Sequence, residues 1–243
     1  SCIFIRDGKL VPIPRHTREI EGKSINEYRF QVQEGDTFVL TSDGTIYAGV
    51  GKLLNLGWTW DNMSAYAVQA AHTTKSAARL AAVLSKACDD LYEGRPGDDT
   101  TVAVMRITRQ RLVKLMTGPP KKPEDDEKAV RQLMDGDAYR IVSGGTSANI
   151  VSRILGKKIT DVSEQTPAPD IPPIARIEGI DLTTEGVLTL SHAIDLLKRY
   201  ANNEDDDAFY NDLDQKNGSA MIASVLIEDC TDLEIILGTA VNA

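Results

Sequence analysis

Residues 37–44 read TFVLTSDG, and this stretch decides the fold expected for the first half of the chain. The run from Thr37 to Leu40 is apolar or β-branched, which predicts a buried strand. The Ser-Asp-Gly that follows puts the carboxylate of Asp43 at the edge of a sheet, and Gly44 lets the chain turn sharply beside it. The motif alone is weak, because Asp-Gly is also a common turn dipeptide.

A second junction of this kind occurs in PGDDTTVAV, residues 96–104. Asp98 and Asp99 come just before its apolar run, so two strands each carry a carboxylate at one end. Carboxylates that neighbouring strands bring together repel each other unless a cation lies between them. Because the ligands are hard oxygens, with no cysteine or paired histidine alongside, the pattern favours Mg²⁺ or Mn²⁺ over zinc.

The remaining segments of residues 1–110 predict short strands with two helices inserted late in the order. The expected strands are CIFIR, KLVPI, NEYRFQV, DTFVLTS and TTVAVMRIT, and the expected helices cover residues 65–71 and 75–92. This order indicates a layered α+β domain with an antiparallel sheet.

TFVLTSDG, followed by helices and then GDDTTVAVMRI, resembles the PPM family of metal-dependent serine/threonine phosphatases, in its bacterial sporulation-stage-II-E-like (SpoIIE-like) branch. IRDGKLVPI and EYRFQVQEGDTFVL match the hairpins that precede this motif, so the resemblance covers residues 1–109. It implies that the fold is a partial antiparallel β-sandwich flanked by helices and that Asp43 and Asp98 are metal ligands, with Gly44 and Asp99 in supporting positions. It also implies two divalent ions, Mn or Mg, whose shared hydroxide attacks the phosphorus of a phosphoprotein substrate.

The same resemblance implies further acidic ligands on earlier strands of the family's fold, and those motifs are missing from this sequence. Asp7-Gly8 reads as a hairpin turn and cannot replace them. Two carboxylates alone should hold Mg²⁺ weakly. We therefore expect a fragment or processed product that is a poor or inactive phosphatase, unless the N-terminal segment of the same domain joins it as a partner.

The second half of the chain has a different pattern. TGPPKKPEDDE has the composition of an exposed linker, which we place at residues 111–126. Alternating helices and strands over residues 127–243 predict a smaller α/β domain with a parallel sheet. The expected helices are 127–134, 147–155, 191–200 and 218–228; the strands are 138–142, 158–162 and 233–237; a Pro-rich loop covers 167–181, and an acidic surface segment covers 202–214.

A strand runs into a Gly-Gly turn and a helix in RIVSGGTSANIVSRILG, residues 140–156. Free backbone amides at the start of a helix, beside a hydroxyl, can form a phosphate-binding site. The alternative is an ordinary strand–turn–helix junction with a Ser or Thr cap and no ligand. A second junction at residues 183–185 would complete a crevice for a phosphorylated or nucleotide-like ligand if the two loops face each other. The candidate anion-binding residues are Gly144, Gly145, Thr146 and Ser147.

Composition narrows the choice of partners and compartment. The net charge of −9 gives the chain no electrostatic reason to bind nucleic acid or an anionic membrane, so neither is expected as a partner. Three scattered cysteines without metal-ligand spacing indicate reduced thiols, and we expect a cytoplasmic protein. The sequence does not decide whether the chain forms a homodimer.

These patterns lead to two hypotheses about the function of the protein. The first is a metal-dependent serine/threonine protein phosphatase, of which residues 1–110 are the C-terminal half of the catalytic domain. Residues 127–243 also resemble the C-terminal extension of some PPM-type phosphatases of anaerobic bacteria, which implies no particular activity. The alternative is a non-catalytic regulatory protein whose α/β domain binds a phosphorylated small molecule.

Overall fold

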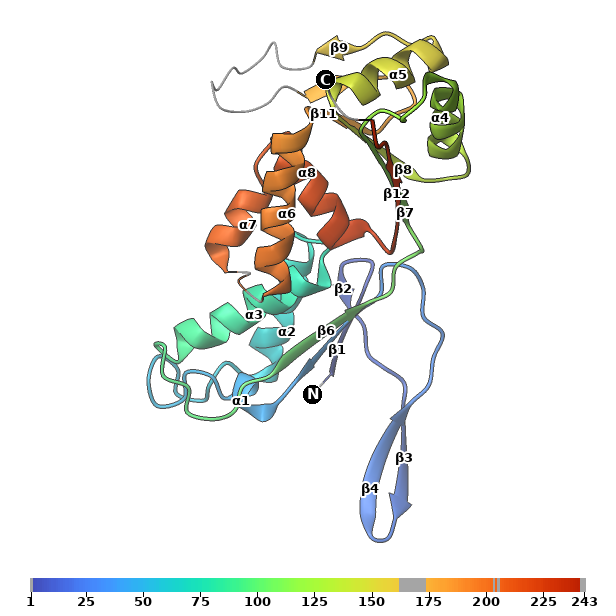
Figure 1. The fold of residues 1–243 in the computed structure, drawn as a ribbon. Helices are drawn as coiled ribbons and strands as arrows, with labels where there is room; N and C mark the ends of the chain where they lie inside the picture. Colours follow the sequence, from blue (N-terminus) through green and yellow to red (C-terminus); the bar gives the residue numbers. More distant parts are fainter. Residues whose placement is uncertain (1, 162–173, 203, 205, 241–243) are drawn as a thin grey trace. The chain divides into compact units, whose positions relative to one another are not determined.

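The computed structural model describes residues 2–161, 174–202, 204 and 206–240 (Figure 1). The chain divides into two compact units, Ser1–Arg109 and Gln110–Ala243. The second unit is the larger, whereas the sequence suggested a smaller C-terminal domain. The segment expected to be a linker, 111–126, also differs, because strand β7 (Leu112–Thr117) lies within it and is buried over most of its length in the second unit's sheet.

The first unit is built on a four-stranded antiparallel sheet, as the sequence predicted. Its strands follow the order β2-β1-β5-β6, where β1 is Cys2–Arg6, β2 is Lys9–Leu10, β5 is Thr37–Thr41 and β6 is Val102–Arg106. Helices α2 (Trp60–Ala71) and α3 (Ala77–Leu91) pack on the sheet. The mixed α+β architecture is therefore confirmed.

Side-chain alternation along the strands selects the face that the helices cover. Ile3, Ile5 and Val39 are buried, and they share one apolar core with Leu80 and Leu84 of α3. The segment between β5 and β6 supplies both helices, so the end of β5 and the start of β6 are fixed by the same core. These two strand ends carry the candidate acidic residues.

A second small sheet was not predicted. Strands β3 (Arg15–Ile20) and β4 (Lys23–Tyr28) form a hairpin whose residues are almost all exposed, where the sequence suggested one strand over residues 26–32. The hairpin was not predicted because its residues are mostly charged or polar, so they do not show the alternation of apolar and polar residues that indicates a strand. The chain returns to the core at Phe30, whose ring lies 5.1 Å from that of Phe4.

The second unit contains a six-stranded sheet of order β12-β7-β8-β11-β10-β9. The first four strands are parallel, as predicted, and the last two extend the sheet in antiparallel fashion. Besides β7, the strands are β8 (Tyr139–Ser143), β9 (Thr160–Asp161), β10 (Ile174–Arg176), β11 (Leu182–Thr184) and β12 (Asp232–Leu237).

Helices cover both faces of this sheet (Figure 1). On one face α4 (Asp126–Met134) and α5 (Gly145–Leu155) share a core with Met116 and Val142. On the other, α6 (Val187–Ala201) and α8 (Gly218–Ser224) share a core with Leu115 and Ile141. The helix after β8 and the helix after β11 thus leave the sheet toward opposite faces.

The remaining helical segments lie near the ends of these elements. A 3₁₀ turn at Pro123–Asp125 leads into α4, and a π-helical segment, Val225–Asp229, continues α8. The acidic segment 202–214 is not a fully solvated surface stretch, because it contains α7 (Asp207–Leu213) with Phe209 buried. Residues 162–173, which include part of the expected Pro-rich loop, lie outside the described residues. Within the described part of the chain, no helix combines the length and apolarity needed to cross a membrane.

Candidate functional site

Asp43 is the first residue of the short helix α1 (Asp43–Ile46), directly after β5. Its side chain is exposed, and its Oδ1 accepts a hydrogen bond from the backbone N–H of Gly44 at 3.1 Å. Most of the carboxylate's lone pairs therefore face solvent. The structure places this group where the sequence predicted it, at the end of a core strand.

Asp98 lies in the loop that leads into β6 and is also exposed. Its Oδ1 accepts a hydrogen bond from the backbone N–H of Asp99 at 2.8 Å, which fixes the side chain against its own loop. The side chain of Asp99 is also exposed. Its backbone carbonyl oxygen accepts a hydrogen bond from the Ser42 hydroxyl at 3.0 Å.

Direct contacts join the two loops. The Ser42 hydroxyl also accepts from the backbone N–H of Thr101 at 2.9 Å, and the Ser42 N–H donates to the Thr101 carbonyl at 3.1 Å. Gly44 packs so closely that a Cβ there would lie 2.5 Å from the carbonyl oxygen of Asp99. The glycine of the SDG motif is thus required by contact with the second motif, and the loops of Asp43 and Asp98 are held side by side.

Tyr92 completes this junction, and sequence reasoning missed it. Its buried hydroxyl donates to the carbonyl oxygen of Gly44 at 2.7 Å. Burial raises the pKa of Tyr92, and the negative charges of Asp98 and Asp43 raise it further. Tyr92 thus ties the end of α3 to the backbone of the SDG motif. The only signal in the sequence was the position of Tyr92 at the end of a predicted helix.

The donor set suits a hard divalent cation. Asp43 and Asp98 provide two exposed carboxylates from adjacent loops, the ligand type that Mg²⁺ and Mn²⁺ prefer. Among the described residues, no group of three or more His, Cys, Asp or Glu side chains could hold a metal ion. These residues thus fit part of a metal site, and the other coordination positions remain for water, substrate oxygens or further ligands.

The model of one protein family, described as Stage II sporulation protein E (SpoIIE), matches residues 19–108. This range includes Asp43, Gly44, Asp98 and Asp99, together with the part of the first unit's core that follows strand β1. The first unit contains a SpoIIE-like, PPM phosphatase-type region. Gln110–Ala243 lies beyond this SpoIIE-like match.

Two solved structures of the phosphatase domain of the cell fate determinant SpoIIE from Bacillus subtilis are also similar to the chain. One is 19% identical, with 44% of this chain and 48% of that chain covered and a TM-score of 0.32. The other, presoaked with Mn, is 18% identical, with 45% and 47% covered and a TM-score of 0.33. The chain thus spans about half the length of these solved relatives. No curated protein matches it significantly.

The second predicted site lies outside the SpoIIE-like region, at the start of α5. Gly144, Gly145, Thr146 and Ser147 all line one cavity, and the loop after β11 lines it from the other side. The two junctions therefore do face each other. Sequence reasoning missed the contribution of the end of β7 and the loop after it, where Thr117 and Pro119 also line the cavity.

Proposed function

We propose that the SpoIIE-like region is part of a divalent-metal-dependent phosphatase that hydrolyses phosphoserine or phosphothreonine in a protein substrate. The observation that carries this proposal is the junction at which Ser42, Gly44 and the Asp99 backbone hold the loops of Asp43 and Asp98 together. This junction lies within the range of residues that the SpoIIE family model matches.

Each residue of the junction has a defined role in this proposal. Asp43 and Asp98 would hold a Mn²⁺ or Mg²⁺ ion through their exposed carboxylates. Such an ion, when bound, supplies electrostatic stabilisation of a phosphoryl group and activates water as a nucleophile. Ser42 and Gly44 are positioning residues, because they fix the separation of the two loops without offering a charged ligand.

The exposure of both carboxylates bears on substrate and affinity. An open site admits a phosphorylated side chain that belongs to a protein surface, which a closed cavity would exclude. Two carboxylates leave most of the coordination shell of a divalent ion to other ligands, so binding to these residues alone should be weak. We propose that a further segment of the phosphatase domain supplies the missing carboxylates, as a partner of this region.

Metal binding and turnover test the proposal together. Binding of Mn²⁺ would be followed by the loss of the electron paramagnetic resonance signal of the hydrated ion, and turnover by hydrolysis of p-nitrophenyl phosphate. Asp43→Asn and Asp98→Asn should each weaken Mn²⁺ binding at least about tenfold, because each removes a charged ligand. Any Mn²⁺-dependent turnover should disappear in both variants.

Asp89→Asn is the matched control, since it removes one exposed carboxylate from the same unit outside the junction. It should leave Mn²⁺ binding unchanged. Equal binding in the control and in the two junction variants would contradict the proposed metal site. Metal-dependent turnover that survives Asp43→Asn would contradict the proposed catalytic role.

A further inference from the structure

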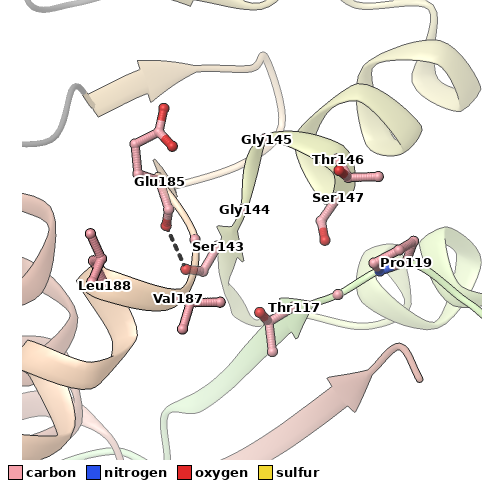
Figure 2. Close-up of a pocket in the computed structure, with 12 residues that line it drawn as sticks. Thr117, Pro119, Ser143, Gly144, Gly145, Thr146, Ser147, Glu185, Val187 and Leu188 are labelled. Atoms are coloured by element: carbon pink, nitrogen blue, oxygen red, sulfur yellow. Dashed lines mark hydrogen bonds between the residues drawn. The ribbon is translucent and has the colours of Figure 1, made fainter. Parts of the chain in front are cut away.

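The cavity of the second unit has the position and size of a ligand site. It lies at the carboxyl ends of the adjacent parallel strands β7, β8 and β11 and has a volume of about 530 Å³ (Figure 2). Small-molecule sites typically occupy roughly 300–1,000 Å³. All lining residues, from Thr117 to Leu188, belong to the second unit.

The topology around the cavity creates an opening between two strands. Because α5 and α6 leave β8 and β11 toward opposite faces, the loops between strand and helix diverge there. Open α/β sheets bind ligands at such a switch point, outside the carboxyl ends of the strands. The loops stay in contact at their bases, where the Gly144 N–H donates to the Thr184 carbonyl at 2.9 Å and the Ser143 hydroxyl donates to the Glu185 carbonyl at 2.8 Å.

Two helix N-termini border the cavity. The residues that precede α5 and α6 are Gly144 and Gly186, and neither offers a side chain to cap the helix. The first-turn amides of these two helices are therefore not bound by a side chain at the cap position. Each helix start carries a partial positive charge from the helix dipole, so the two together favour an anion.

Ser147 is an independent indication of a ligand. Its side chain is 1% exposed, and its hydroxyl has no hydrogen-bond partner among the described residues. It also lines the cavity, and Figure 2 shows its Oγ pointing from the first turn of α5 into the open space. A buried hydroxyl without a partner costs free energy, which an acceptor oxygen of a ligand in the cavity would recover.

Apolar side chains at the start of α6 indicate what accompanies the anion. Val187 and Leu188 line the cavity but are 78% and 71% exposed, so the described residues cover little of their surface. The carboxylate of Glu185 points away from Ser147 in Figure 2, so it does not fill the space beside the Ser147 hydroxyl. The cavity thus combines an anion-binding end with an apolar rim.

We propose that this cavity binds a phosphate monoester of a small organic molecule. The phosphate group accepts hydrogen bonds from the first-turn amides of α5 and α6 and from the Ser147 hydroxyl, and the organic group packs against Val187 and Leu188. The site belongs to a different unit from the Asp43–Asp98 junction, and its test does not depend on the proposed phosphatase activity.

The test uses the full chain with EDTA, which keeps metal chemistry out of the measurement. Inorganic phosphate and phenyl phosphate are titrated by calorimetry at constant ionic strength. Gly145 allows a sharp pair of variants, because a Cβ at this position would meet no atom within 4 Å. Gly145→Asp should bind both probes at least about tenfold more weakly than the isosteric Gly145→Asn, because the two side chains have the same size and only the aspartate repels an anion.

Two further variants test the hydroxyl. Ser147→Ala should weaken phosphate binding by about three- to tenfold, the effect of one lost hydrogen bond. Thr183→Val is its matched control, because Thr183 also has a buried hydroxyl without a partner among the described residues but does not line the cavity. This control should bind phosphate as the original chain does.

The organic part of the ligand has its own readout. Phenyl phosphate should bind at least about fivefold more tightly than inorganic phosphate, and Leu188→Ser should remove much of that difference, because less apolar surface is then covered. The proposal is overturned if neither probe shows saturable binding, or if Gly145→Asp binds phosphate as well as Gly145→Asn. Equal affinity for the two probes would overturn the assignment of an organic monoester.

Discussion

At Gly44 a side chain as small as a methyl group would collide with the carbonyl oxygen of Asp99, 2.5 Å from the position of a Cβ. Gly44→Ala should therefore lower the free energy of unfolding of the first unit by about 1–3 kcal/mol, the usual result of overpacking. Nearby Gly97→Ala is the control, because its Cβ would make only an ordinary contact, 3.5 Å from Tyr92. Urea unfolding followed by tryptophan fluorescence measures both; similar losses would contradict the contact.

Asp36 makes the first unit sensitive to acid. Its buried carboxylate accepts from the Arg6 guanidinium at 2.8 and 2.7 Å and from the Gln33 N–H at 2.8 Å. The hydrogen bonds from Arg6 are the main reason that the pKa of Asp36 lies below its ordinary value of 3.8. Since the folded-state pKa is depressed, the pair stabilises the unit fully above pH 3.8, and this stabilisation is lost as the pH falls through the folded-state pKa.

Asp36→Asn should consequently lower the free energy of unfolding at pH 7 and pH 5, and the difference from the unsubstituted chain should shrink below pH 3.8. Urea titrations at pH 7, 5 and 3 measure this difference. Glu34→Gln is the control, because its partner Arg109 and Glu34 itself are both exposed and such pairs contribute little. A deficit in Asp36→Asn that stays constant down to pH 3 would count against the assigned titration.

Among single residues, the sequence could locate Asp43 and Asp98, because each adjoins an apolar run that had to be a core strand. It could not show that Gly44 contacts the Asp99 backbone, nor that Tyr92 reaches the same place, since both facts depend on how α3 packs on the sheet. The missing partner of the Ser147 hydroxyl is likewise invisible before tertiary structure exists.

Helix α7 anchors the acidic segment through one ring. Phe209 is fully buried, and its ring lies 6.1 Å from that of Tyr200, 5.2 Å from that of Tyr210 and 5.3 Å from the guanidinium carbon of Arg199. Phe209→Ala should lower the free energy of unfolding of the second unit by about 3–5 kcal/mol, because it leaves a cavity.

Guanidinium unfolding followed by far-ultraviolet circular dichroism measures the effect of Phe209→Ala. Asp207→Ala is the control, since this exposed residue at the start of α7 contributes at most about 1 kcal/mol through the helix dipole. Equal losses in the two variants would mean that α7 is held by its charges and not by its buried ring.

Elements with a clear apolar period were predictable, and those with interrupted patterns were not. The expected helices 127–134 and 147–155 correspond closely to α4 and α5, because their apolar residues recur at helical spacing. Strand β7 was not predicted because Lys114 interrupts its apolar run. In the structure this lysine is buried; its Nζ lies 3.3 Å from the Glu234 carboxylate and donates to the Gln132 carbonyl at 2.7 Å. Helix α7 was not predicted for a similar reason, because acidic residues separate the few apolar residues of its segment.

For the molecule as a whole, each apolar core belongs to one unit. The core of the first unit draws on residues 3–104, and the two cores of the second draw on residues 113–236. Residues 110–243 produced alone should therefore fold cooperatively and give a dispersed amide spectrum by nuclear magnetic resonance.

The matched control is a chain of residues 127–243, the boundary that composition alone suggested. It lacks β7, the strand that pairs with both β8 and β12, so it should fail to form the sheet. A dispersed spectrum from the shorter chain, or an undispersed one from residues 110–243, would contradict the assigned boundary.

The pairing of β7 with β12 also sets the order of events on a ribosome. Leu112 pairs with Asp232, and at about 5–20 residues per second these two residues are synthesised about 6–24 seconds apart. During that interval one edge of β7 is open, and Lys114 lacks its Glu234 partner. A nascent chain that stalls after β11 would thus expose an apolar strand edge able to pair with other chains, so we expect slow or incomplete translation to favour aggregation.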